Sequence, residues 1–438
     1  MELSKLKLEE LSPVRKRIEV EIPAGTVQSE LDRAFAAVGR AARLRGFRPG
    51  KAPRPVLERV FGERVRQDVL ERLIGESLKQ ALDTHRLAVV GTPDVEAEGL
   101  TPGQALRYAA TIDVRPVIEV RDLSGLEAVR PTAVVSDAEV DEVLESLRQS
   151  VAQLRPIEGR TIVEAGDVVT VDVTSRVDGG EPVRREGVML EAGAGSFPEA
   201  LERLLVGQPL GARRAFDVTY PADHPRPALA GKRVHFDVEV KEIRLKELPP
   251  LDDDFARDHG RCETLAELRA RIRADLEERA AQRAEEIARA TVVDQLIARH
   301  PFEVPPSLVE RRTEAWLASL DVKLAADAAE REAQLERLRA ELRPGAERDV
   351  RAELVLEAVA AHAGITVSED DVAAEIAALA AREGRAPERV RAFYERPEAR
   401  AALRARLVRE RALAHVMRHA TIVSTDDAKE FARTGQSR

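Results

Sequence analysis

The sequence predicts a multidomain α+β protein, with an N-terminal α+β domain, a central antiparallel β-domain and a C-terminal all-α domain with helical arms. First, 438 residues are enough for about three domains of ~150 residues each. Second, charged residues make up 34% of the chain and aromatic residues only 3%, a composition typical of long helices. Third, the spacing of apolar residues changes along the chain between a strand period and a helical period.

The N-terminal α+β domain is predicted over residues 1–115. Its apolar residues pass from a two-residue period to a helical period and then return to strand patterns. Strand patterns cover residues 14–22, 88–95 and 106–120, and helical patterns cover residues 27–44 and 53–78. A loop rich in glycine and proline separates the two helical stretches, so the pattern is that of one closed α+β unit.

Residues 116–155 are predicted to connect this domain to the next. The connector begins with an extended segment and continues into one helix between about residues 136 and 154. Ser136-Asp137-Ala138-Glu139 opens this helix, because a serine followed three residues later by glutamate has the spacing of a capping box.

A small antiparallel β-domain is predicted over residues 156–246. Apolar residues alternate strictly in several short runs, of which residues 234–240 form the longest. Glycines punctuate these runs at the positions where tight turns are expected. One short helix is expected near Ala200.

The predicted C-terminal domain, residues 247–438, is helical throughout. Breaker-free stretches cover residues 262–298 and 307–343, and shorter helices are expected at 346–363, 368–383 and 397–419. Their apolar stripes are narrow and rich in alanine, so these helices can pack as an arm-like bundle without a thick core. We therefore expect several large apolar side chains to stay partly exposed.

Charge and cysteine content restrict the class of partner and the compartment. The net charge of −9 disfavours general attraction to nucleic acid or to an anionic membrane, so a basic site must be local. The single cysteine excludes an intramolecular disulfide and fits a reducing cytosol. Neither a secretory signal pattern nor an apolar run of ~18 residues is present, so we expect a cytoplasmic protein with no membrane partner.

The loop between the first two helices is the most informative local motif. Between Arg33 and Arg66 the chain has ten basic and two acidic residues, a local charge of +8. Such a patch with one aromatic side chain at its tip suits phosphate-rich RNA or an acidic protein surface. The alternative is an ordinary solvated interhelical loop. The candidate docking residues are Gly46, Phe47, Arg48, Pro49, Gly50 and Lys51.

The motif Gly46–Pro53 resembles the GFRxGKxP ribosome-docking signature of trigger factor, a family of bacterial chaperones that meet nascent chains at the ribosomal tunnel exit. The resemblance covers almost the whole chain. Residues 168–245, with Leu229–Lys232 before a strand, resemble the FKBP-like peptidyl-prolyl isomerase domain of the family. Residues 248–256 and 301–309 resemble the entry and the first bend of its helical chaperone domain. In the docking loop Pro49 stands where the family commonly has lysine, so one docking cation is missing.

The resemblance also implies a set of isomerase pocket residues. An FKBP-like pocket surrounds the proline ring with aromatic side chains, which desolvate the amide and ease its rotation. The aromatic candidates here are Phe197, Tyr220 and Phe236. Other pocket positions carry residues that are neither aromatic nor acidic: Val173, Pro182, Val183, Ala200 and His224. We therefore expect an isomerase domain with a depleted pocket and weak activity.

By resemblance, the chain is an ATP-independent chaperone that binds the large ribosomal subunit near the tunnel exit and holds nascent unfolded polypeptides. Sparse apolar side chains on a charged helical surface would hold such segments weakly over a large area. Two alternatives stay open: a protein that is mainly a peptidyl-prolyl isomerase, and an RNA-binding ribosome assembly factor that uses the +8 patch. The sequence also leaves open a weak homodimer.

No cofactor or metal is expected from the sequence. His415 and His419 have the four-residue spacing of metal ligands on a helix, but a third ligand is not evident. Asp252-Asp253-Asp254 lacks the alternate spacing and the glycine of a calcium loop. These aspartates suit the start of a helix, where carboxylates interact favourably with the helix dipole.

Overall fold

The computed structural model divides into two compact units, Met1–Pro131 with Glu285–Arg438 and Thr132–Ala284, which are considered separately. The structure describes residues 4–42, 44, 47, 53–101, 103–121, 123–132, 134–178, 180–193, 205–221, 229, 231–322, 324, 327–383 and 387–425. The short helix expected near Ala200 lies outside these residues.

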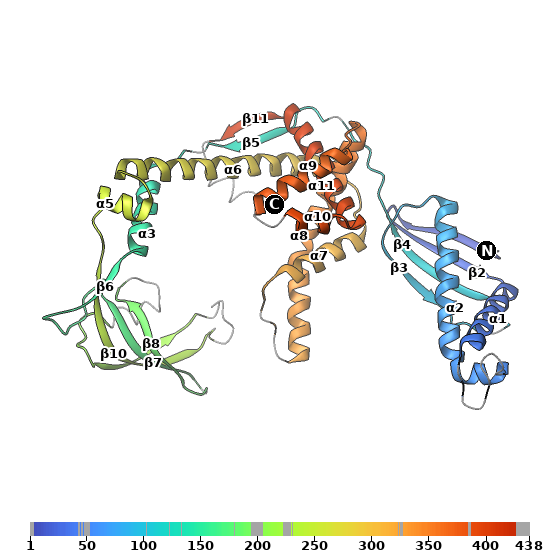
Figure 1. Ribbon diagram of the computed structural model, residues 1–438, viewed down its shortest axis with the longest axis horizontal. Helices are drawn as coiled ribbons and strands as arrows, with labels where there is room; N and C mark the ends of the chain where they lie inside the picture. Colours follow the sequence, from blue (N-terminus) through green and yellow to red (C-terminus); the bar gives the residue numbers. More distant parts are fainter. Residues whose placement is uncertain are drawn as a thin grey trace. The chain divides into compact units, whose positions relative to one another are not determined.

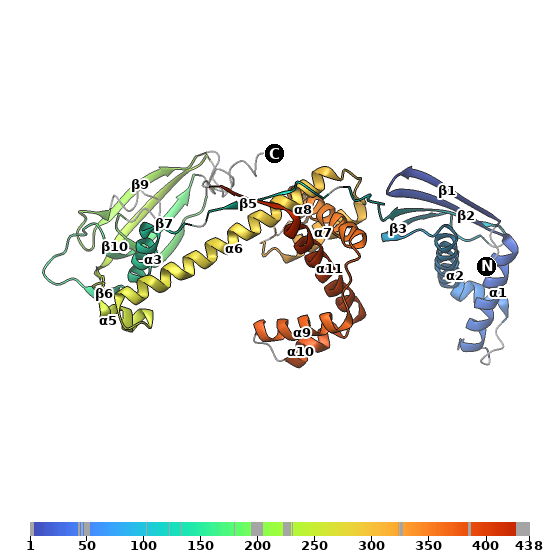
Figure 2. The same ribbon diagram turned by 90° about the horizontal axis from the view of Figure 1, so that it is seen from above.

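The N-terminal part of the first unit is a four-stranded antiparallel sheet with both helices on one face (Figures 1 and 2). Its elements are β1 (Lys5–Ser12), β2 (Arg15–Ile22), α1 (Ala24–Ala41), α2 (Arg54–His85), β3 (Val89–Ala97) and β4 (Leu106–Val114). The strand order is β1-β2-β4-β3. The strand β1 was not predicted; it is an edge strand, and its apolar Leu6 and Leu8 are only partly buried.

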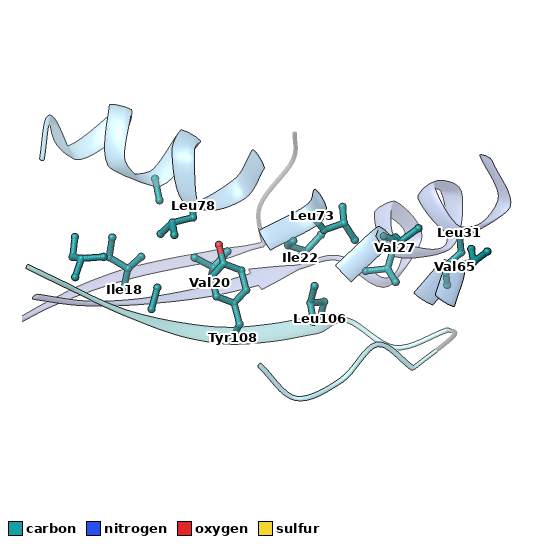
Figure 3. Close-up of a cluster of buried hydrophobic side chains, with 14 of the residues drawn as sticks. Ile18, Val20, Ile22, Val27, Leu31, Val65, Leu73, Leu78, Leu106 and Tyr108 are labelled. Carbon is teal, nitrogen blue, oxygen red and sulfur yellow. The ribbon is translucent and has the colours of Figure 1, made fainter. Parts of the chain in front are cut away.

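The core of this part lies between β2, β4 and the two helices (Figure 3). Alternate residues of β2, Ile18, Val20 and Ile22, face α2 and are almost completely buried. This core also contains one buried polar pair, in which the Ser77 hydroxyl lies 2.7 Å from the Tyr108 hydroxyl. Burial raises the pKa of Tyr108 above its usual value, so the phenol stays protonated in this core.

Most of the remainder of the first unit is helical, as predicted, although a helix over residues 387–394 was not expected. Its elements are the C-terminal half of α6 (Leu265–Arg299), α7 (Pro306–Ser319), α8 (Ala328–His362), α9 (Glu369–Glu383), α10 (Pro387–Tyr394) and α11 (Pro397–His419). Three small apolar clusters support these helices, and each contains only a few large side chains. The expectation of a thin, divided core is therefore confirmed.

The expected helix over residues 307–343 is wrong, because α7 ends at Ser319 and α8 begins at Ala328. Asp327 opens α8, since its carboxylate accepts hydrogen bonds from the N–H groups of Ala329 (2.9 Å) and Glu330 (3.0 Å). The expected break at Pro344 does not occur, and α8 continues through it. Contacts with α7 lie on both sides of this proline: Arg339 pairs with Glu314 at 2.7 Å before it, and Ala346 and Val350 pack in the same cluster as Val309 after it.

Trp316 of α7 lies directly against Gly345 of α8. A Cβ atom at position 345 would be 3.0 Å from the indole ring, closer than ordinary contact. The small residue therefore allows the two helices to approach. Trp316 packs between α7 and α8, which favours a structural role for it over a role as an exposed substrate contact.

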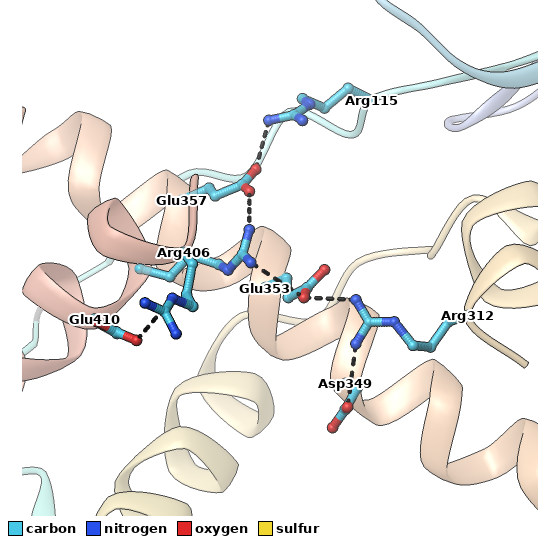
Figure 4. Close-up of polar contacts among 8 residues, drawn as sticks. Arg115, Arg312, Asp349, Glu353, Glu357, Arg406 and Glu410 are labelled. Atoms are coloured by element: carbon cyan, nitrogen blue, oxygen red, sulfur yellow. Dashed lines mark hydrogen bonds and ion pairs between the residues drawn. The ribbon is translucent and has the colours of Figure 1, made fainter. Parts of the chain in front are cut away.

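A chain of ion pairs connects the helices where apolar packing is sparse (Figure 4). Glu357 of α8 pairs with Arg115, just after β4, at 2.6 Å and with Arg409 of α11 at 3.0 Å. Arg409 also lies 3.5 Å from Glu353, which pairs with Arg312 of α7 at 2.6 Å. These partly buried pairs form one network, which is worth more than the same pairs in isolation.

Two further elements of the first unit were not predicted. The strands β5 (Glu127–Pro131) and β11 (Thr421–Thr425) pair in parallel, although they lie at opposite ends of the helical region in sequence. They run along α6 in both views (Figures 1 and 2). Leu126 and Ala128 are completely buried in the same cluster as Val292 and Leu296 of α6.

The sheet is joined to the start of α7 by contacts centred on Ser307. The carboxylate of Asp113, at the end of β4, accepts a hydrogen bond from the Ser307 N–H at 2.8 Å. The Ser307 hydroxyl donates to the carbonyl of Val90 at 3.2 Å. Pro305 offers no side-chain cap for α7, so Asp113 supplies this cap from a distant strand.

The second unit contains the predicted connector helix and antiparallel β-domain. Its elements are α3 (Asp137–Ser150), β6 (Gln153–Pro156), β7 (Val168–Val177), β8 (Val183–Glu191), β9 (Arg213–Thr219), β10 (Arg233–Glu247), α5 (Asp253–Phe255), the π-helical turn η1 (Ala256–Gly260) and the first half of α6. The capping box of α3 is confirmed, because Ser136 and Glu139 exchange their hydrogen bonds as predicted. The long strand β10 pairs with β7 on one side and with β6 and β9 on the other.

Substitution of Gly91 should destabilise the contact between the sheet and α7. Gly91 has φ +76°, and a Cβ atom there would lie 2.5 Å from the Cβ of Ser307. We expect Gly91→Ala to lower the free energy of unfolding by ~2 kcal/mol or more, measured by urea denaturation. Gly75→Ala is the matched control, because this exposed position in α2 has no atom within 4 Å of an added Cβ. It should gain up to about 1 kcal/mol from helix propensity, and equal midpoints for the two variants would contradict the assignment.

Candidate functional site

The predicted docking loop connects the end of α1 to the start of α2. Of its six candidate residues the structure describes Phe47, whereas Gly46, Arg48, Pro49, Gly50 and Lys51 lie outside the described residues. The Phe47 side chain is 39% exposed, and its N–H donates a hydrogen bond to the carbonyl of Leu44 at 3.1 Å. An aromatic side chain with this exposure is available for contact with a partner.

Arg54 was counted among the cations of this loop, but its side chain is engaged within the domain. Its guanidinium carbon lies 3.9 Å from the ring centroid of Phe35. The same side chain pairs with Asp32 at 3.2 Å and with Glu58 at 2.6 Å. Arg54 therefore holds α1 against α2. The signal in the sequence was an acidic residue four positions after it, a spacing typical of a pair within one helix.

Other cations of the +8 patch stay available on the described surface. Arg40, Arg59 and Arg64 are exposed, and none of them forms an ion pair with another residue that the structure describes. Val60 is 53% exposed and lies four residues before Arg64, so the two share a face of α2. An exposed apolar side chain among unpaired cations suits an acidic surface or a phosphate-rich one.

The predicted isomerase residues fall in different surroundings. Phe197 lies outside the described residues, as do Ala200 and His224. Phe236 of β10 is only 6% exposed and stacks on Phe216 of β9, with ring centroids 5.3 Å apart and planes inclined by 12°.

The stacked pair Phe216–Phe236 is part of the hydrophobic core of the β-domain. Phe216 and Phe236 are register partners in the antiparallel pair β9–β10, so their side chains share one face of the sheet. Val173 of β7 is 5% exposed in the same cluster. Tyr220 follows β9 and packs partly buried at the edge of this cluster, with its N–H bonded to the carbonyl of Lys232 at 3.0 Å. Phe216 was not predicted as the ring partner, although its alternation with Val218 indicates that both lie on the buried face of β9.

The opposite face of β9–β10 carries a charged group. Asp217 accepts hydrogen bonds from Arg233 at 2.6 Å and from Nδ1 of His235 at 2.9 Å. The hydrogen bond from Arg233 and then that from His235 hold the pKa of Asp217 below its usual value. This carboxylate therefore stays ionised and paired, and it cannot act as a general acid near neutral pH.

The helical part presents apolar side chains to solvent, as predicted. Leu320 and Leu324, which follow α7, are 42% and 44% exposed, and Val322 between them is 37% exposed. Phe393 of α10 is 52% exposed and contacts Tyr394 edge-on, with ring centroids 5.1 Å apart. These exposed apolar side chains form two small groups on a charged surface, so the surface can hold apolar segments only weakly and at more than one point.

His415 and His419 lie one turn apart on α11, with ring centroids 4.7 Å apart. Within the described part of the chain, no group of three or more histidine, cysteine, aspartate or glutamate residues could hold a metal ion. Every helix within the described ranges is too short or too polar to cross a bilayer.

Comparison with known proteins gives a consistent result along the chain. The family model described as "Bacterial trigger factor protein (TF)" matches residues 4–147, and that described as "Bacterial trigger factor protein (TF) C-terminus" matches residues 264–418. The chain is 37% identical over 418 residues to "Trigger factor" of Anaeromyxobacter sp. (strain Fw109-5), covering 94% of this chain and 97% of that protein. It is 36% identical over 441 residues to "Trigger factor" of Geobacter metallireducens (strain ATCC 53774 / DSM 7210 / GS-15), covering 97% and 99%.

Among solved structures, the chain is similar to one described as "Promiscuous Substrate Recognition in Folding and Assembly Activities of the Trigger Factor Chaperone". The two are 22% identical, with a TM-score of 0.45, and the match covers 94% of this chain and 99% of that one.

Proposed function

Since this chain belongs to the trigger factor family of bacterial chaperones, we propose that it docks on the large ribosomal subunit near the tunnel exit and holds nascent unfolded polypeptides there without ATP. The observation that carries the holding function is the set of separate, exposed apolar side chains on the charged helical part. Weak contacts at several points bind an unfolded chain and release it without a nucleotide-driven step.

We assign the proposed functions to four parts of the chain. Residues 1–115 dock on the ribosome, residues 116–155 connect, residues 156–246 form the isomerase domain, and residues 247–438 hold the client. Support for the docking role comes from the exposed Phe47 and from Arg40, Arg59 and Arg64, which lack ion-pair partners among the described residues. Their charge favours a ribosomal surface that is acidic or phosphate-rich.

The isomerase activity is proposed to be weak. Phe236 is already covered by Phe216, so the one described aromatic candidate on the sheet offers little open surface to a proline ring. Val173, which the family resemblance assigns to the pocket, is aliphatic and only 5% exposed, so it also offers little surface to a substrate. Tyr220, at the edge of the cluster, is then the described aromatic side chain best placed to contact a substrate.

The docking assignment predicts that Phe47→Ala combined with Arg48→Ala weakens ribosome binding by at least ~2 kcal/mol, because both an apolar anchor and a cation are lost. Co-sedimentation with large ribosomal subunits at two salt concentrations measures this, and the affinity of the parent should fall as salt rises. Arg33→Ala is the control, since Arg33 is exposed and already pairs with Glu30 at 2.6 Å. If the double variant pellets as the parent does, the loop is not the anchor. Binding to ribosomal RNA alone would favour the assembly-factor alternative.

The holding assignment predicts that replacing Leu320, Leu324 and Phe393 by serine reduces the suppression of aggregation of an unfolded client several-fold, because the exposed contact points are lost. Light scattering with the full-length chain measures the effect. The control replaces Met189 and Leu210 of the β-domain by serine, which are 61% and 49% exposed. If the control loses suppression and the helical variant retains it, the client site lies in the β-domain.

Because the pocket has few aromatic residues, we expect its isomerase rate to be at least ~10-fold lower than that of an FKBP domain lined by aromatic residues. A tenfold difference in rate requires only ~1.4 kcal/mol less stabilisation of the transition state. A proline-limited refolding assay with the full chain measures the rate. Phe236→Ala would be uninformative, because loss of this buried ring costs about 3–5 kcal/mol of stability. Tyr220→Ala is the better probe. A rate equal to that of the aromatic-lined domain, and lost in this variant, would show that the pocket works with other residues.

A further inference from the structure

The two outer edges of the short parallel sheet β5–β11 differ among the residues that the structure describes. In a parallel pair, alternate residues of each strand direct their N–H and C=O groups toward the partner and the others direct them away. Thr421 donates its N–H to the carbonyl of Leu126 at 2.8 Å, so it faces β5. Ile422 and Ser424 therefore direct their backbone groups to the outer edge of β11.

A side chain of α6 covers one end of the outer edge of β5, at Glu127. The amide of Gln295 accepts a hydrogen bond from the N–H of Glu127 at 3.0 Å and donates one to its carbonyl at 2.7 Å. This amide thus pairs with the strand as a neighbouring backbone would. Pro131 has no N–H at the other end of the same edge. Charged side chains at Glu127 and Arg130 further discourage pairing of this edge with another strand.

The outer edge of β11 has none of these protections among the described residues. Its sequence, Thr-Ile-Val-Ser-Thr, contains no charge and no proline and has high β-propensity. Across the residues that the structure covers, no hydrogen bond reaches the outward N–H or C=O groups of Ile422 and Ser424. An uncharged, unpaired edge of this kind is a template for a further strand.

The outer edge of β11 also carries an exposed apolar side chain, Ile422. Ile422 is the register partner of Ala128, so the two side chains share one face of the sheet. Ala128 is completely buried in the cluster with α6, whereas Ile422 is 58% exposed. An added strand would cover Ile422 with its own side chain on that face, which adds apolar contact to the backbone hydrogen bonds.

We propose that the outer edge of β11 binds an extended, uncharged, β-prone segment of an unfolded client as an additional strand. This inference rests on the proposed holding function and names the conformation and chemistry of the segment that is held. Backbone recognition suits a chaperone, because every unfolded client offers the same N–H and C=O groups whatever its sequence. The residues after β11, Asp426-Asp427-Ala428-Lys429-Glu430, are poor strand formers, which favours a client over the chain's own tail as the occupant.

Peptide binding to the full-length chain tests this proposal. The probe is a fluorescent, uncharged peptide of about eight residues with alternating valine and threonine, the length of an ordinary strand. A second peptide has the same side chains but carries N-methyl groups on alternate amides, which removes its backbone donors along one edge. We expect the methylated peptide to bind roughly five- to tenfold more weakly in fluorescence anisotropy.

Variants of the chain locate the site. Ser424→Pro removes one outward N–H and leaves the bonds to β5, and Ser424→Ala is its matched control. Ile422→Lys is a second variant that keeps the backbone intact and adds a charge at the edge. We expect Ser424→Pro and Ile422→Lys to weaken peptide binding roughly five- to tenfold and Ser424→Ala to bind as the parent does.

Equal affinity of Ser424→Pro and Ser424→Ala, or of the two peptides, would overturn the proposal. If these affinities are equal while the parent still suppresses client aggregation, strand addition at β11 is wrong but the holding function stands. Both it and the holding function fail if the parent neither binds peptide nor suppresses aggregation. A change in sedimentation of Ser424→Pro with unchanged peptide affinity would assign the edge to a second copy of the chain. Peptide binding only after truncation at Thr425 would assign it to the chain's own tail.

Discussion

Two carboxylates one turn apart on α8, Glu353 and Glu357, hold together much of the helical part. Arginines from α7, from α11 and from the segment after β4 converge on them (Figure 4). The chain uses charge in this way because its helices have few large apolar residues to bury against one another. Removal of one partner from such a partly buried network leaves a charge without its counter-ion. The network therefore favours this one arrangement of the helices as well as stabilising it.

The thin core also leaves apolar side chains on the surface that we propose to hold clients. A chain that buried its leucines and phenylalanines in a thick core would expose few of them. Here Leu320, Leu324 and Phe393 stay about half exposed on a helical part that is rich in charged residues. The β-domain is built in the opposite way. Phe216 and Phe236 stack on each other inside its core. This packing stabilises the sheet, but it leaves little aromatic surface exposed to a substrate.

The contacts around Ser307 and around Gln295 show how side chains complete backbone hydrogen bonding between distant segments. Asp113 caps α7 from the end of a strand, and Gln295 pairs with Glu127 as a strand would. Both satisfy polar groups at the ends or edges of elements, where secondary structure alone leaves them free. On the outer edge of β11 no described residue supplies such a group, and this is the edge that we propose binds a further strand.

By itself, the sequence determined the order of domains, the alternation of β10 and the capping box at Ser136, because each depends on neighbours within a few residues. The motif Gly46–Pro53 is likewise local, and its docking role stays a prediction. Only the tertiary structure decided which residues meet across long separations. It paired β11 with β5, engaged Arg54 with Phe35, and carried α8 through Pro344 by packing on α7. Periodicity reports which face of an element is buried, but the identity of the partner depends on close packing in three dimensions.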